Sequence, residues 1–187
     1  MPEQTELDPL SPNEATLAQL IECIGKALEE DDAEIRSYTH TRGESGGILL
    51  VPTERYCQAV AWKAVVQKWP ALIEVDYHDL VIGGSRRDYG VAVEMKFWNN
   101  DSDLQEIKKD ICKITRGKAK HGYIVVFSAN PRLNESGNSK TSENLDWLAK
   151  RVFGPNHTPS PRDYRFLTAN GAGREVEFWV AGWQVKP

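Results

Sequence analysis

The segment VAVEMKFW, residues 91–98, decides the fold class of this chain. Side chains alternate between the two faces of a β-strand, and here every odd-numbered residue up to Phe97 is apolar. The opposite face carries Glu94 and Lys96, so that a carboxylate and an ammonium lie side by side on an otherwise apolar strand. Two explanations are open: an ion pair near the end of a sheet, or the polar centre of a metal-dependent hydrolase.

The elements predicted on both sides of this strand indicate an α/β fold. Two short apolar runs, 71–75 and 79–82, precede it, and a glycine-rich turn at 83–90 joins the second run to it. Helices with apolar stripes are predicted at residues 54–69 and 102–115, and a strand buried on both faces is predicted at 122–129. This order of elements is typical of a mixed central sheet flanked by helices.

The chain of 187 residues is predicted to form a single domain, which is long enough for a substantial core. The order helix, three strands, helix, strand (αβββαβ) spans residues 53–128 of this domain. Residues 1–10 are polar and acidic and are expected to be a disordered tail. Residues 130–187 are expected to form a C-terminal extension, and no motif in that extension indicates a function.

The segments outside the core are predicted from their apolar spacing. An N-terminal helix carries an apolar stripe from Leu17, and the acidic run at 29–32, where the stripe ends, is interpreted as solvated surface. In the C-terminal extension we expect a helix over 143–154 and a strand over 174–185. The proline-containing stretch at 155–164 is expected to be irregular.

Composition excludes several classes of protein. The net charge is −4, so any binding site for a polyanion has to be a local basic patch. Three cysteines without a Cys-x-x-Cys pair argue against a disulfide framework and against a structural zinc site. No apolar run approaches the roughly 18 residues of a membrane span, and the acidic N-terminal segment is unlike a signal peptide. We therefore expect a cytoplasmic protein that does not bind membranes.

A second carboxylate is predicted to join Glu94. If residues 79–82 and 91–97 form an antiparallel hairpin, Asp79 and Glu94 fall at the same end of it, because their spacing is symmetric about the turn. Side chains directly opposite each other in such a pair have Cβ atoms about 5 Å apart. Lys96 shares the face of Glu94. Two carboxylates and one ammonium would then converge at one strand end.

This set of groups suits metal-assisted phosphodiester hydrolysis. Two close carboxylates repel each other, and a hard divalent cation removes that penalty because carboxylate oxygens are its natural ligands. The ion lowers the pKa of a water ligand and polarises the phosphorus centre. An ammonium such as that of Lys96 can favour the hydroxide or offset charge on a phosphoryl oxygen.

The run DLVI, the turn and the VEMK element together resemble the PD-(D/E)XK, or restriction-endonuclease-like, nuclease superfamily. The resemblance covers roughly residues 53–128 and implies the αβββαβ core of that superfamily, with Mg²⁺ or Mn²⁺ as cofactor. It implies that Asp79 and Glu94 bind the ion and that Lys96 assists the attacking water. It also implies the backbone carbonyl of Met95 as a further ligand and Glu54 as an acidic residue from the first core helix.

Some residues near the motif have other interpretations. His78 stands where the motif name has proline, and Asp76 is an alternative to Asp79; both are interpreted as polar residues at a strand end. Glu54 also suits the first turn of a helix, where the macrodipole favours negative charge. Asp110 and Lys113 could reach the site but are interpreted as helix-surface charges.

Basic residues that could hold nucleic-acid phosphates lie in the turn before the motif and along the next helix. They are Arg86, Arg87, Lys108, Lys109, Lys113, Arg116, Lys118 and Lys120. Cations near a helix C-terminus are equally favoured by the macrodipole, so the helical members have a structural explanation as well. The two arginines of the turn could equally be exposed surface residues that bind nothing.

These observations favour a Mg²⁺- or Mn²⁺-dependent nuclease that acts on DNA. A catalytically inactive subunit of the nuclease fold, binding nucleic acid or another protein, is the alternative from a different class. An RNase or a structure-specific resolvase shares the chemistry and differs only in substrate. A homodimer or a partner subunit that supplies specificity is compatible with each of these hypotheses.

Overall fold

The structure, a computed structural model, describes residues 15–41, 46–50, 54–83, 89–99, 103–154 and 159–186. Within these ranges the helices are α1 (Leu17–Thr41), α2 (Glu54–Val66), α3 (Asp103–Arg116) and α4 (Lys140–Phe153), with a 3₁₀ turn, η1, at Ile48–Leu50. The strands are β1 (Ala71–Val75), β2 (His78–Ile82), β3 (Val91–Phe97), β4 (His121–Asn130), β5 (Arg162–Ala169) and β6 (Glu175–Lys186). The tail predicted at 1–10 lies outside the described residues, as do Arg86 and Arg87.

The six strands form one mixed sheet in the order β1-β2-β3-β4-β6-β5. Strands β3 and β4 run parallel, and every other neighbouring pair is antiparallel. The parallel pair requires a crossover connection, and α3 supplies it. The α/β class, the mixed sheet and the order helix, three strands, helix, strand are therefore confirmed.

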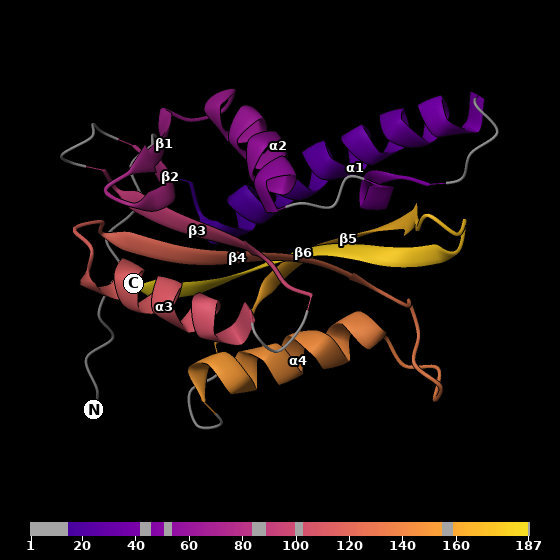
Figure 1. The fold of residues 1–187 in the computed structure, drawn as a ribbon. Helices are drawn as coiled ribbons and strands as arrows, with labels where there is room; N and C mark the ends of the chain where they lie inside the picture. The colour runs from indigo at the N-terminus through magenta and orange to yellow at the C-terminus, as the bar shows by residue number, and fades with distance from the viewer. Residues whose placement is uncertain are drawn as a thin grey trace.

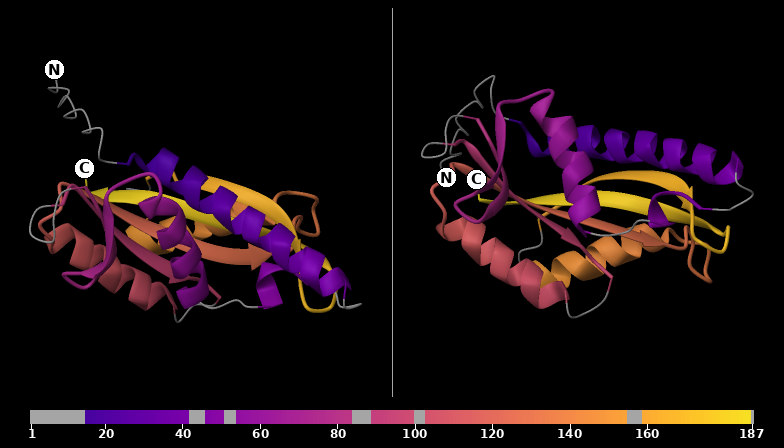
Figure 2. Two further views of the ribbon diagram at one scale, coloured as in Figure 1. Left: turned by 90° about the horizontal axis from the view of Figure 1, so that it is seen from above. Right: turned by 45° about the horizontal axis from the view of Figure 1, so that its top comes forward.

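Helices cover both faces of the sheet. Figures 1 and 2 show α1 and α2 on one face and α3 and α4 on the other. Strand β4 is buried between them: Val125 packs in the core beneath α1 and α2, while Ile124 and Val126 pack in the core against α3 and α4. A strand buried on both faces has no polar side to alternate, which explains its continuous apolar sequence.

Strand β3 has the predicted faces. Its odd-numbered residues from Val91 to Phe97 belong to the core beneath α1 and α2. The register pairs Leu80 with Val93 and Ile82 with Val91. One position further along, Asp79 of β2 reaches β3 beside Glu94, where its side chain accepts a hydrogen bond from the Met95 N–H. The sheet thus carries the two carboxylates at one end of the β2–β3 hairpin.

Two expectations about the flanking segments are wrong. Residues 162–169 form β5, which pairs along β6, whereas an irregular stretch was expected as far as residue 164. The prolines that suggested irregular chain, among them Pro159 and Pro161, end just before the strand. From Arg165 onward, β5 alternates more and less buried positions, with Phe166 turned inward.

Helix α1 continues past the acidic run to Thr41, and the second wrong expectation concerns the run itself. Asp32 lies one turn beyond the buried Leu28 and is itself 2% exposed. Its Oδ1 accepts hydrogen bonds from the Ile48 N–H, at 2.6 Å, and from the Thr168 hydroxyl, at 2.5 Å. The interpretation of this run as solvated surface is therefore wrong for Asp32, which links α1 to η1 and β5.

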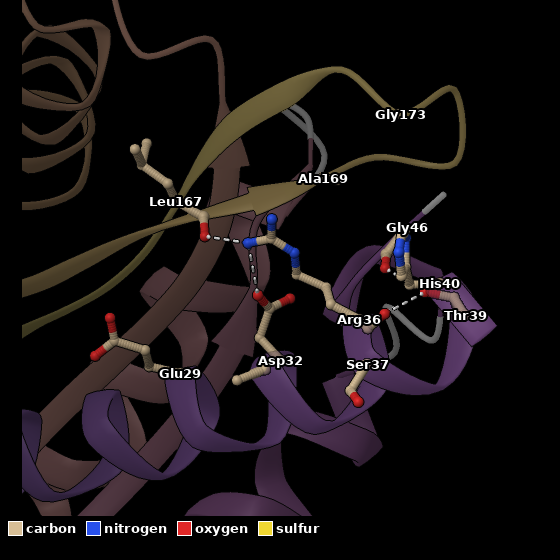
Figure 3. Close-up of a pocket in the computed structure, with 11 residues that line it drawn as sticks. Glu29, Asp32, Arg36, Ser37, Thr39, His40, Gly46, Leu167, Ala169 and Gly173 are labelled. Carbon is tan, nitrogen blue, oxygen red and sulfur yellow. Dashed lines mark hydrogen bonds and ion pairs between the residues drawn. The ribbon is translucent and has the colours of Figure 1, made fainter. Parts of the chain in front are cut away.

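A cavity of about 660 Å³ lies beside this carboxylate, between the C-terminal half of α1 and β5 (Figure 3). Arg36 lines this cavity, with its Nη1 3.9 Å from Asp32 Oδ2 and 3.4 Å from the Leu167 carbonyl oxygen. The guanidinium thus bridges the helix to the edge strand of the sheet.

Candidate active site

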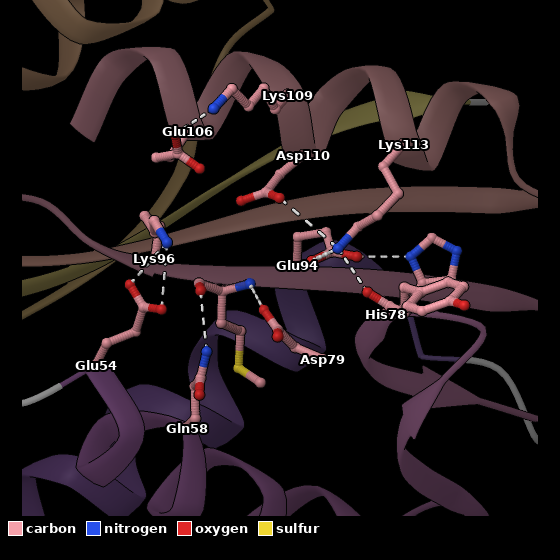
Figure 4. Close-up of polar contacts among 12 residues, drawn as sticks. Glu54, Gln58, His78, Asp79, Glu94, Lys96, Glu106, Lys109, Asp110 and Lys113 are labelled. Carbon is pink, nitrogen blue, oxygen red and sulfur yellow. Dashed lines mark hydrogen bonds and ion pairs between the residues drawn. The ribbon is translucent and has the colours of Figure 1, made fainter. Parts of the chain in front are cut away.

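The predicted residues gather at the end of the β2–β3 hairpin, between the start of α2 and the last turns of α3 (Figure 4). Glu94 is the most buried of them, with 1% of its surface exposed. Its Oε1 lies 2.6 Å from His78 Nδ1, and its Oε2 accepts a hydrogen bond from Lys113 Nζ, also at 2.6 Å. A carboxylate this deeply buried needs such partners on both oxygens.

Asp79 enters from β2. Its Oδ2 accepts a hydrogen bond from the Met95 N–H at 2.7 Å, which ties the side chain to β3. Burial raises the pKa of Asp79 to about 6, the Met95 hydrogen bond opposes this rise, and the negative charge of Glu94 adds to it. The charge of Glu94 on β3 thus acts on the carboxyl of Asp79 on β2.

Lys96 is held by Glu54, the first residue of α2. Lys96 Nζ lies 3.3 Å from Glu54 Oε1 and 3.2 Å from Oε2, and the Phe97 N–H donates to Oε2 at 3.2 Å. Burial disfavours the charged form of Lys96, but the charge and hydrogen bond of Glu54 outweigh it and raise the pKa of the ammonium. Lys96 therefore stays protonated and offers positive charge rather than a base. The charges of Asp110 and Asp79 also act on it.

Asp79, Glu94, Lys96 and Glu54 form a cluster of charged side chains, called here the carboxylate cluster. Asp110 and Lys113 of α3 join it, so the interpretation of these two residues as surface charges is wrong. Lys113 Nζ contacts Glu94, the Tyr77 carbonyl oxygen at 2.5 Å, and Asp110 Oδ1 at 3.7 Å. Burial, followed by the charge of Glu94, raises the pKa of Asp110. The helix crosses directly over the strand end, and sequence spacing alone does not report such a crossing.

Two further neighbours were missed by sequence reasoning. His78, interpreted as a polar strand-end residue, is 2% exposed and contacts Glu94. Gln58 donates from Nε2 to the Met95 carbonyl oxygen at 3.2 Å. A signal for Gln58 was present, because it follows Glu54 by four residues and so lies on the same face of α2.

Asp79 and Glu94 are the residues that could hold a divalent ion, with the Met95 carbonyl beside them. All three provide the hard oxygen ligands that Mg²⁺ and Mn²⁺ prefer. Burial is the main cause of the raised pKa of Asp79, and a bound cation would favour the charged form of this carboxylate. Within the described ranges, no group of three or more His, Cys, Asp or Glu side chains is arranged to hold a metal. Mg²⁺ is commonly bound through one or two carboxylates with water and substrate phosphates, so the chemistry of this pair fits it.

The basic residues of α3 line a groove beside the cluster. Lys108, Lys109, Lys113 and Arg116 surround it together with Gln105 and Cys112, and its volume is about 440 Å³. Lys109 also pairs with Glu106 at 2.5 Å. Lys118 and Lys120 are exposed in the loop that follows the helix. Lys113 belongs to both the groove and the carboxylate cluster.

Comparison of the chain with models of protein families, with curated proteins and with solved structures gives no significant match. In the part of the chain that the structure describes, no helix combines the length and the apolar character needed to cross a membrane.

Proposed function

We propose that this chain is a metal-dependent nuclease of the PD-(D/E)XK type, which hydrolyses phosphodiester bonds in DNA with Mg²⁺ or Mn²⁺. The observation that carries the proposal is the meeting of Asp79, Glu94 and Lys96 at one hairpin end, with Glu54 reaching Lys96 from α2. The αβββαβ order of the elements around them supports the same proposal.

Each residue has a distinct role in this proposal. Asp79 and Glu94 hold the ion, and Met95 contributes its carbonyl oxygen. When bound, a divalent ion supplies activation of the attacking water and neutralisation of charge at the phosphoryl group. Lys96, kept protonated by Glu54, places positive charge where the phosphoryl oxygens gain negative charge.

The substrate path in this proposal follows the basic groove of α3. Nucleic-acid affinity depends mainly on cations placed along the phosphate backbone. Lys108, Lys109 and Arg116 lie in this groove, next to the carboxylate cluster, although the net charge of the whole chain is −4. A local basic surface beside an acidic centre is the charge distribution that a metal-dependent nuclease needs.

The proposal is tested by digestion of supercoiled plasmid in Mg²⁺, Mn²⁺ or EDTA, in parallel with single-stranded DNA and RNA. We expect metal-dependent cleavage of DNA, and at least a hundredfold slower cleavage by Asp79→Asn and by Lys96→Met. Matched controls are Asp146→Asn and Lys150→Met, which alter an exposed ion pair on α4. Cleavage in EDTA, or equal cleavage by site and control variants, would contradict the proposal. Cleavage of RNA alone would change the substrate.

One observation favours the alternative, a nuclease-fold subunit that binds nucleic acid or protein without cleaving. Both carboxylate oxygens of Glu94 already have protein partners, His78 and Lys113, so an ion has to compete for this ligand. Titration of the protein with labelled DNA in Mn²⁺ separates the two functions. Binding without product at any metal concentration would favour the inactive subunit.

A further inference from the structure

The ammonium of Lys113 lies among oxygens from three different elements. It contacts a carboxylate of β3, Glu94 Oε2, at 2.6 Å and the carbonyl oxygen of Tyr77, in the turn before β2, at 2.5 Å. Asp110 Oδ1, on α3 itself, lies 3.7 Å away. Carboxylate and carbonyl oxygens converging on one point are the surroundings of a hard cation in proteins.

Lys113 is also the cation that compensates Glu94. The lysine of the motif, Lys96, pairs instead with Glu54, the first residue of α2. Lys113 also lies near a second carboxylate, because its Nζ is 2.6 Å from Glu94 Oε2 and 3.7 Å from Asp110 Oδ1. One ammonium is therefore shared between two acids, which a divalent ion would neutralise more fully.

We propose that Lys113 is a resident cation: it holds Glu94 in the metal-free protein and gives up this carboxylate when a divalent ion binds. This inference rests on the proposed function. The side chain has somewhere to go, because a third of it is exposed and it lines the groove of Lys108, Lys109 and Arg116. There its ammonium is available to a phosphate of the substrate.

A resident cation lowers the apparent affinity for the metal. The ion binds only molecules in which Lys113 has released Glu94, so the dissociation constant rises in proportion to the rarity of that state. Removing the ammonium has two opposite effects. The metal-free protein loses stability, since Glu94 stays buried with His78 as its remaining side-chain partner, and the metal-bound protein forms more readily.

The test is Mn²⁺ binding by isothermal titration calorimetry, with thermal unfolding of the same samples with and without Mn²⁺. We expect Lys113→Met to bind Mn²⁺ about tenfold more tightly than wild type. Without metal, this variant should unfold at a lower temperature than wild type, and Mn²⁺ should raise its unfolding temperature by more than it raises that of wild type. Lys150→Met on α4 removes the same charge from an exposed pair and controls for net charge, so its affinity should match wild type. If Lys113→Met does not fold, Lys113→Gln keeps a donor for Glu94 and is expected to shift the affinity in the same direction.

The outcomes separate the two proposals. Equal or weaker Mn²⁺ binding by the Lys113 variants, with wild-type binding and DNA cleavage intact, overturns the resident cation and leaves the nuclease. Absence of Mn²⁺ binding in wild type and in every variant overturns both. A gain in affinity that Lys150→Met reproduces assigns the effect to overall charge and also overturns the resident cation.

Discussion

Among the residues that the structure describes, two carboxylates are almost completely buried, and their surroundings differ. Asp32 is surrounded by neutral donors, the Ile48 N–H and the Thr168 hydroxyl, with Arg36 at the edge of the cavity. Glu94 instead contacts two ionisable groups, His78 and Lys113.

The neighbours of the two carboxylates differ even more. Around Glu94, the carboxyls of Asp79 and Asp110 have raised pKa values because they are buried near another negative charge. The contacts of Asp32 join α1, η1 and β5 and leave its Oδ1 with two donors. A buried acid with complementary partners stabilises a fold, whereas crowded acids with perturbed pKa values indicate a functional site.

The largest expected effect on stability is at Asp32. Asp32→Ala leaves the Ile48 N–H and the Thr168 hydroxyl without their acceptor, so we expect a loss of about 3 kcal/mol in the free energy of unfolding. Thr168→Val removes one hydroxyl and keeps the shape, and should cost about 1 kcal/mol. Urea denaturation measures both. A loss below 1 kcal/mol for Asp32→Ala would mean that this carboxylate does not stabilise the fold.

Neutralising Asp79 should act in the opposite direction. Its pKa in the folded protein, about 6, exceeds the ordinary value of 3.8, so the folded state binds its proton more tightly than the unfolded state. The contribution of this group to stability therefore falls as pH rises from about 4 to about 6, and the resulting penalty persists above that range. We expect Asp79→Asn to raise the free energy of unfolding at pH 8 by on the order of 1 kcal/mol.

The measurement is urea denaturation of wild type and Asp79→Asn in metal-free buffer at pH 4, 5, 6 and 8. The advantage of the variant should grow with pH across this range. If Asp79→Asn is less stable than wild type at pH 8, the negative charge of Asp79 is well compensated in the folded protein. That result would contradict the prediction.

The smallest expected effect concerns the groove of α3. Lys108→Gln and Lys109→Gln should each reduce the slope of log affinity against log salt by about 1 if each lysine contacts a phosphate. Fluorescence anisotropy with labelled DNA in EDTA measures this without cleavage. Lys140→Gln on α4 is the matched control, and an identical slope in all variants would remove the groove from the substrate path.

The sequence predicted the parts of the fold that depend on local periodicity. Alternation fixed the two faces of β3, and the symmetric spacing about the turn brought Asp79 next to Glu94. The prediction from the sequence failed at the start of β5, because prolines that end just before this strand suggested irregular chain as far as Tyr164. Each of these predictions used residues that lie at most fifteen positions apart in the sequence.

The partners of Glu94 could not be predicted in this way. Lys113 reaches the cluster because α3 crosses over the end of β3, and the 36 positions that separate it from Tyr77 carry no trace of that contact. The burial of His78 likewise depends on elements packed around it. A charged residue on a helix has the same sequence signature whether the face beneath it is water or a carboxylate.

The central claim is that Asp79 and Glu94, unlike Asp32, form a cation site. Calorimetric titration of Mn²⁺ into wild type, Asp79→Asn and Asp32→Asn tests it most directly, with folding of each variant checked by circular dichroism. We predict one ion bound with millimolar or tighter affinity in wild type and in Asp32→Asn, and at least tenfold weaker binding in Asp79→Asn. Equal affinity in Asp79→Asn and wild type, or no binding in wild type, would contradict the account.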